Sequence, residues 1–304
     1  MDGRISNLAQ VASLRRYTLT EGAGKGLDVI DCDNGRIRFL LNVDKALDVM
    51  QLYHEGQNMS FISKNGFVKR ELPFDNRFEG GMLYTCGLDN IGAHEGFELH
   101  GKLHCTPAEV LRAEVDEQGI TVEAVIRCTE MAGKNLVIRR KITAAVGATS
   151  MEIEDVLCNE GYRTEKYCLL YHVNMGYPML DEGARVVADV ERCTPRNPWS
   201  RENLATVFEG LAPVDNRDEC CYFIKLRKPT VDFVNEKLGK KFNLTYSADT
   251  LPCFVEWHSM ASGDYAIGLE PCTAELDDTF AYSEIKSGER ITFRLTMGVE
   301  ALSK

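Results

Sequence analysis

The sequence predicts a mainly β protein, built as an antiparallel sandwich or barrel. Short runs rich in Val, Ile and Thr recur along the chain, and turn residues separate them. Few windows have the spacing of an amphipathic helix, and strands do not alternate with helices as in βαβ units. With 44% hydrophobic and 27% charged residues, the composition is that of an ordinary globular protein with a sizeable core.

Two hairpins are the clearest local features. The first pairs residues 111–115 with 120–128 across the turn Asp-Glu-Gln-Gly at 116–119. The second pairs residues 136–144 with 151–158 around Gly147. In its second strand Met151 and Ile153 alternate with glutamates, which is the period of a half-buried strand.

Further strands are expected along the rest of the chain, at residues 166–173, 220–226, 230–233, 241–246, 253–257, 265–269 and 290–297. Residues 43–55 fit an amphipathic helix or strands, and we favour strands. Residues 201–208 fit one or two helical turns, and Pro195 and Pro198 indicate a surface loop.

The chain reads as one continuous body. A length of 304 residues allows one or two domains. There is no repeat of fixed period and no low-complexity linker. We therefore expect a single domain over residues 1–304.

Charge and cysteine content narrow the partners and the compartment. The formal net charge is -11, which disfavours nucleic acid and anionic membranes as partners. No apolar stretch is long enough to span a bilayer, and the first residues do not resemble a secretory signal. The 11 cysteines are odd in number and typical of reduced thiols. We expect a cytoplasmic protein, and a homo-oligomer stays open.

Two of the six histidines and one glutamate stand at places suited to chemistry. His100 follows a glycine-rich stretch, and His172 ends an apolar strand that runs into a Gly and Pro loop. Glu270 ends another apolar strand, directly before Pro271. If the fold brings them together, a carboxylate and two imidazoles can act as general acid and base.

The sequence offers two other candidate sites. His100 and His104 have the i, i+4 spacing of a zinc site, with His94 and Cys105 nearby. The run around them does not read as a helix, so we favour no metal. Cys86 needs an electropositive site to act as a nucleophile, and buried filler is the better interpretation.

Four ordered motifs resemble a known family. They are NRFEGGMLYTCGLDN at 76–90, LHGK at 99–102, YHVNMGYP at 171–178 and GLEP at 268–271. Together they resemble the DUF4432 family of aldose 1-epimerase-like proteins, in the galactose mutarotase-like superfamily. The resemblance runs from about residue 48 to residue 270. It implies a large antiparallel β-sandwich (supersandwich) whose concave face binds a sugar without a metal or organic cofactor.

The resemblance also implies roles for individual residues. Glu270 would be the base on the anomeric hydroxyl and His172 the acid on the ring oxygen. Arg77 and His100 would hydrogen-bond sugar oxygens, and Trp257 would offer an aromatic face. Asp89 and Asn174, in the same motifs, are also assigned to substrate binding. The aspartate of the family has no clear counterpart, with Asp89 and Asp181 as candidates.

The expected function is therefore an enzyme that interconverts the anomers of a small-molecule sugar by acid and base catalysis of ring opening. Two alternatives stay open because a fold does not fix function. One is a carbohydrate-binding protein without turnover. The other is an isomerase, epimerase or lyase that acts on a modified or phosphorylated sugar.

Overall fold

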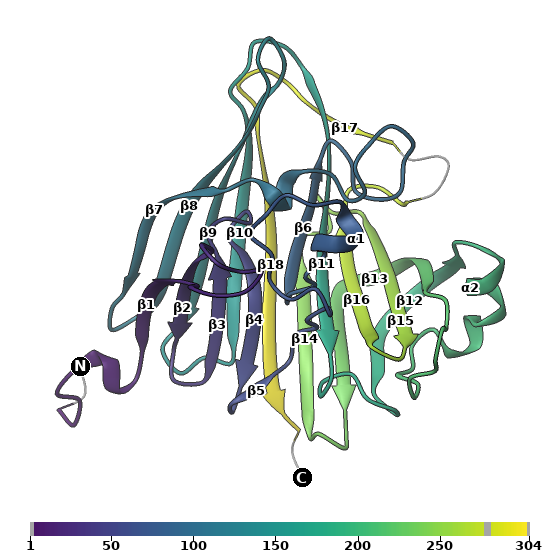
Figure 1. The fold of residues 1–304 in the computed structure, drawn as a ribbon, viewed down its shortest axis with the longest axis horizontal. Coiled ribbons are helices and arrows are strands. Elements are labelled where there is room, and N and C mark those ends of the chain that lie inside the picture. The colour runs from purple at the N-terminus through teal and green to yellow at the C-terminus, as the bar shows by residue number, and fades with distance from the viewer. Residues whose placement is uncertain (1–2, 277–280, 303–304) are drawn as a thin grey trace.

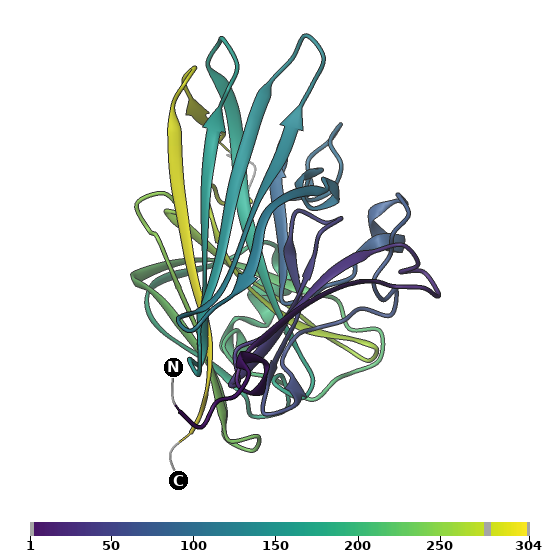
Figure 2. The same ribbon diagram turned by 90° about the vertical axis from the view of Figure 1, so that its left-hand side faces the viewer.

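The computed structural model describes residues 3–276 and 281–302. Two antiparallel sheets make up most of it, and the predicted β-sandwich is confirmed (Figure 1). The smaller sheet has the order β1-β2-β3-β4-β5, with bounds Ser13–Thr18, Asp28–Asp33, Ile37–Asn42, Asp48–His54 and Gln57–Asn58. In Figure 2 this purple sheet lies across one face of the larger sheet, whose strands run in colour from teal through green to yellow.

The larger sheet has 13 strands, in the order β17-β11-β16-β15-β13-β14-β18-β10-β9-β8-β7, with β12 beside β13 and β6 beside β11. One half of it carries β7 (Ala108–Val115), β8 (Gly119–Thr129), β9 (Asn135–Ala145), β10 (Ser150–Asn159) and β18 (Arg290–Ala301). The other half carries β6 (Leu83–Leu88), β11 (Glu165–Gly176), β12 (Arg185–Pro195), β13 (Cys220–Asn235), β14 (Lys240–Tyr246), β15 (Cys253–Ala261), β16 (Asp264–Cys272) and β17 (Ser283–Ile285).

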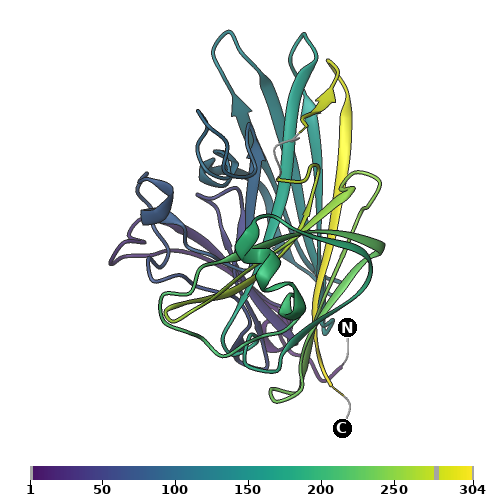
Figure 3. The same cartoon turned by 90° about the vertical axis from the view of Figure 1, so that its right-hand side faces the viewer.

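Helices are short and peripheral. They are α1 (Phe74–Arg77), α2 (Pro198–Glu202) and three 3₁₀ turns at Leu8–Gln10, Leu103–Cys105 and Leu204–Thr206. In Figure 3 helix α2 stands in front of the strands at one end of the molecule. No helix in the described ranges has the length and apolar character that crossing a membrane requires.

Both predicted hairpins are present as β7–β8 and β9–β10. Residues 220–226 and 230–233 were expected as two strands, but they form the single strand β13, which pairs with β15 first and with β14 further along. In the segment 43–55 only β4 is a strand. Pro195 ends β12 and Pro198 begins α2, so the expected loop between them is very short.

The two sheets enclose the main hydrophobic core. Val49 and Leu52 of β4 pack there with Ile138, Ile153 and Phe293 of β9, β10 and β18, and all five are buried. In β10 and β18 these core residues alternate with more exposed ones, because successive residues of a strand point to opposite faces.

A buried ionic network also joins the sheets. Arg140 of β9 donates to Asp48 of β4 at 2.6 Å and to Asp155 of β10 at 2.9 and 2.7 Å. Tyr171 donates to Asp155 at 2.7 Å, and His104 lies 2.7 Å from Asp48. Buried charges are costly unless they are paired and hydrogen-bonded, so each member holds the others in place.

Strand β11 separates this core from a second apolar cluster. Tyr171 and Val173 face the main core, whereas Leu170 packs in the second cluster with Val255 of β15 and Tyr84 of β6. Because side chains alternate, His172 falls on the second face. We call this surface, over β6, β11, β16 and β15, the site face.

Candidate active site

His172 and Glu270 meet on the site face. Val173 pairs with Leu269 and Leu170 with Cys272, so the antiparallel register sets His172 opposite Glu270. Directly opposite residues point to the same face of a sheet. His172 Nε2 lies 3.1 Å from Glu270 Oε1, and the two residues are only 3% and 1% exposed.

Gly268 makes room for this pair. A Cβ atom on Gly268 would lie 2.5 Å from Glu270 Oε1 and 2.9 Å from His172 Cε1, too close for real atoms. His172 and Glu270 can therefore occupy these positions only because residue 268 has no side chain. The sequence places Gly268 two residues before Glu270 on the same strand.

Burial governs the protonation of both groups. It raises the pKa of Glu270 well above its ordinary value, helped by the charges of Glu256 and Glu219 and opposed by Arg196. Burial, with a contribution from His100, lowers the pKa of His172 well below its ordinary value. Each shift favours the neutral form, so burial favours a state in which the pair holds one proton in total.

Aromatic rings surround the imidazoles. The rings of Trp257 and Phe78 have centroids 5.4 and 5.9 Å from that of His172. His100 lies edge-on to His172 at 5.5 Å and beside Phe74 at 5.1 Å. The Nδ1 atom of His100 faces the Ile91 carbonyl at 3.0 Å, and burial lowers the pKa of His100 to about 4.

Arg77 reaches the same place through Tyr84, the cross-strand partner of His172. Arg77 donates to the Tyr84 hydroxyl at 2.8 Å and pairs with Glu98. These two contacts hold the guanidinium of Arg77 in a fixed orientation, and the residue is only 3% exposed.

Polar atoms on this face have hydrogen-bonding capacity to spare. His172 Nδ1, Glu270 Oε1 and Asn174 Oδ1 are buried and have no hydrogen-bond partner among the described residues. Asn174 lies opposite Gly268 and so shares the site face with His172. Buried polar atoms normally have partners, so orphans gathered at one place mark a site for a polar ligand.

Two predicted positions lie elsewhere. The Asp89 carboxylate accepts from the Lys102 backbone N–H at 3.3 Å and lines a cavity of about 210 Å³ that His172 and Glu270 do not line. The Asp181 carboxylate accepts from the N–H of Glu182 at 2.8 Å. Neither carboxylate joins the cluster formed by Arg77, His100, His172, Asn174, Trp257 and Glu270.

His100 and His104, whose spacing suggested a metal site, lie in two different environments. His104 faces Asp48 at 2.7 Å and Glu79 at 3.4 Å, whereas His100 faces the Ile91 carbonyl. Across residues 3–276 and 281–302, no group of three or more His, Cys, Asp or Glu side chains is arranged to hold a metal ion.

Some residues of the cluster were not singled out from the sequence. Phe74, Phe78, Tyr84, Glu98 and Gly268 owe their positions to the register of β6, β11 and β16 and to the short helix α1. From the sequence alone, apolar and aromatic residues are interpreted as part of the hydrophobic core. Tyr84 differs from ordinary core because it pairs with His172 across the strands and because its hydroxyl accepts a hydrogen bond from Arg77.

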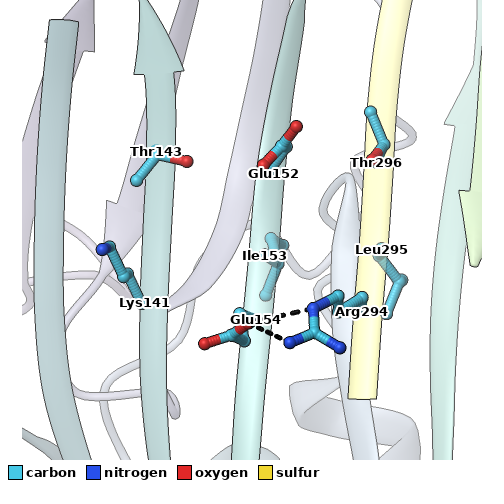
Figure 4. Close-up of a pocket in the computed structure, with 8 residues that line it drawn as sticks. All are labelled: Lys141, Thr143, Glu152, Ile153, Glu154, Arg294, Leu295 and Thr296. Carbon is cyan, nitrogen blue, oxygen red and sulfur yellow. Dashed lines mark hydrogen bonds and ion pairs between the residues drawn. The ribbon is translucent and has the colours of Figure 1, made fainter. Parts of the chain in front are cut away.

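A second concave region lies on the outer surface of the large sheet. This hollow of about 280 Å³ is lined by Lys141, Thr143, Glu152, Ile153, Glu154, Arg294, Leu295 and Thr296 (Figure 4). Arg294 is already paired with Glu154, at 2.7 Å. No imidazole lines this hollow, so it offers no acid and base pair like that of the site face.

Comparison with models of known protein families shows which family this chain belongs to. The model of a family described as a domain of unknown function, DUF4432, matches residues 24–297. The chain belongs to the DUF4432 family. The resemblance found in the sequence motifs is thereby confirmed, and the match includes every cluster residue named above.

Solved structures share the fold of this DUF4432 protein. A candidate aldose 1-epimerase from Klebsiella pneumoniae has a TM-score of 0.86 at 20% identity, over 96% of this chain and 86% of the other. A galactose mutarotase-like protein from Clostridium acetobutylicum has a TM-score of 0.70 at 14% identity, over 96% and 100%. A candidate mutarotase from Salmonella typhimurium has 0.68 at 13%, over 98% and 96%. At these identities the likeness shows the fold. Comparison with curated protein sequences yields no match.

Proposed function

We propose that this protein is an aldose 1-epimerase-like isomerase that interconverts the anomers of a sugar. The observation that carries the proposal is the buried contact of 3.1 Å between His172 and Glu270, on a face with unpartnered polar atoms. The names of the structural neighbours agree with this reaction class. The cysteines, which are free in the structure, favour a cytoplasmic location.

The reaction needs one proton taken and one given. A base removes the proton of the anomeric hydroxyl, the bond from C1 to the ring oxygen breaks, and an acid protonates the ring oxygen. The open-chain aldehyde then turns about the C1–C2 bond and closes on its other face, which returns both protons. A pair that carries one proton in total can supply both roles, each contributing about 10²- to 10⁴-fold.

Burial shifts the pKa values of His172 and Glu270, and these shifts determine which of the two holds the proton before the reaction. The resemblance assigns the base to Glu270 and the acid to His172. The raised pKa of Glu270 and the lowered pKa of His172 favour a resting state with the proton on Glu270. His172 Nε2 and Glu270 Oε1 lie 3.1 Å apart but do not form a hydrogen bond, so Glu270 Oε1 is left to bond a sugar oxygen. Either partner can hold the single proton that the reaction requires, and the partner that holds it acts first as the acid.

The remaining polar and aromatic groups would hold the sugar. Arg77, His100 and Asn174 offer hydrogen bonds to hydroxyl groups, and Trp257 offers its ring face to the apolar C–H side of the sugar. This division of labour resembles other small-molecule sites, in which a few polar groups fix the orientation.

A direct test is polarimetry of freshly dissolved α-anomers of several hexoses, pentoses and sugar acids, with and without the protein. We expect a faster approach to equilibrium for at least one neutral aldose. Wild-type protein that accelerates none of them would defeat the proposal. Calorimetric affinity for a sugar without any rate effect would instead support the binding-only alternative.

A further inference from the structure

A cavity of about 380 Å³ lies along the site face of β15, and Trp257 of the candidate site is one of the residues that line it. Trp257, Ser259 and Ala261 line it, and they are alternate residues of one strand. Val255, the next residue of that series, pairs with Glu270. The cavity therefore begins at the ring of Trp257, whose centroid lies 5.4 Å from that of His172, and runs along β15 away from the pair.

The cavity is longer than one sugar ring. Four residues separate Trp257 from Ala261, which corresponds to about 13 Å at ~3.3 Å per strand residue. Phe74 and Phe78, which pack beside His100 and His172, also line its near end. A sugar whose anomeric carbon lies at the pair leaves the far part of the cavity, toward Asp264, unfilled.

Its lining suits a carbohydrate. Phe61, Phe74, Phe78 and Trp257 supply ring surfaces, and Ser63 and Asn65 add polar groups. Trp257 donates its indole N–H to Glu219 at 2.8 Å, which fixes the plane of the ring. Aromatic surface with a few convergent polar groups is the usual composition of a pocket for a small polar ligand.

The charges that line the cavity favour neutral sugars over phosphorylated or acidic ones. Four carboxylates line the cavity, from Asp75, Asp218, Glu219 and Asp264, against the two cations of Lys64 and Arg217. Lys64 is paired with Asp264 at 2.7 Å, and Arg217 donates to Asn203 at 2.8 Å. In the adjoining cluster Arg77 is paired with Glu98. A phosphate or a carboxylate on the ligand would meet excess negative charge here.

We propose that this cavity is a second subsite, which binds an uncharged sugar unit linked to the one that reacts. The preferred substrate is then a neutral reducing disaccharide or longer glycan, and not a sugar phosphate. This inference rests on the proposed function, because the reacting ring is placed at His172 and Glu270.

The test compares kcat/KM for anomer exchange, measured by NMR, between lactose, maltose and cellobiose, their reducing unit glucose, and glucose 6-phosphate. We expect at least one disaccharide to exceed glucose about tenfold, the worth of about 1.4 kcal/mol of added binding. Glucose 6-phosphate should be the poorest. Ala261→Trp, or Ala261→Leu if the larger residue prevents folding, should bring the ratio of disaccharide to glucose toward one. Val187→Trp, an exposed position on β12, is the matched control and should keep the ratio.

A ratio that is already one in the wild type, or that Ala261→Trp leaves unchanged, would overturn the subsite. So would a preference for glucose 6-phosphate. Calorimetry separates this failure from failure of the proposed function. If no sugar is turned over, the proposed function fails. The subsite is then tested by binding alone: lactose, maltose or cellobiose should bind to the wild-type protein more tightly than to the Ala261 variant, and equal affinities would overturn it.

Discussion

Replacement of Gly268 by alanine is the sharpest structural perturbation of the candidate site. The new Cβ would lie 2.5 Å from Glu270 Oε1 and 2.9 Å from His172 Cε1. Carbon and oxygen atoms pack at about 3.5 Å, so the carboxylate must retreat by about 1 Å. A displacement of that size in a reacting group costs about 10²-fold in rate.

Stability should change much less than activity. Overpacking costs about 1–3 kcal/mol, and the loss of glycine freedom in the unfolded chain returns about 0.4–1 kcal/mol. Gly268 is not at a positive φ, so alanine is compatible with its backbone. We therefore expect Gly268→Ala to stay folded in urea titrations while kcat for anomer exchange falls about 10²-fold.

Gly298→Ala is the matched control. Gly298 also lies in a strand, β18, without a positive φ, and its added Cβ would meet Ser150 Cβ at 3.2 Å, away from the pair. We expect its rate to stay near that of the wild type. A folded Gly268→Ala protein with the same rate as Gly298→Ala would refute the placement of the chemistry at His172 and Glu270.

Three further predictions concern protons and buried charge. The pH profile of kcat should be bell-shaped, with its acid limb below pH 6.5 because burial lowers the pKa of His172, and its alkaline limb above pH 4.5 because burial raises the pKa of Glu270; an acid limb above pH 6.5 or an alkaline limb below pH 4.5 would contradict the one-proton pair. Burial opposes protonation of His104, but its hydrogen bonds to Asp48 and Glu79 prevail and raise its pKa above 6.5. The stability contributed by His104 is therefore complete below pH 6.5 and declines as pH rises through the folded-state pKa, so the difference in unfolding free energy between wild type and His104→Gln should shrink on going from acidic to alkaline urea titrations, and a constant difference would contradict it. Arg140→Met should cost about 3–5 kcal/mol of unfolding free energy, because it leaves the buried Asp155 without a cation and Asp48 with His104 alone. Arg294→Met on the exposed outer face should cost at most about 1 kcal/mol; equal losses would show that the buried network adds no more than a surface pair.

Local sequence patterns predicted much of the fold. The alternation in residues 120–128 and 151–158 gave the strands β8 and β10 because one face of each is buried. The first three strands of the small sheet went unpredicted, although residues 28–33 and 37–42 contain apolar side chains, because short segments with acidic and basic residues carry weak signals. Strand β13 was split in two at a stretch of charged residues that is exposed on the sheet.

The site was predicted as far as separate motifs allow. His100, His172, Asn174, Trp257, Glu270 and Arg77 were named from the sequence, and the structure brings them together. Their distances depend on strand register, which no single motif encodes. Asp89 shares a motif with Arg77, but its carboxylate lies in a different cavity. The role of Gly268 became visible only when the side chains of its neighbours on β11 and β16 were in place.

The most direct test of the acid and base pair is NMR exchange spectroscopy on the sugar that the wild type turns over fastest, repeated for Glu270→Gln, His172→Gln and the double variant. Two groups that act as a unit are non-additive in their effects. We predict a loss of about 10² or more for each single variant, and a double variant no slower than the slower single one. A Glu270→Gln protein that exchanges anomers at the wild-type rate would contradict the account.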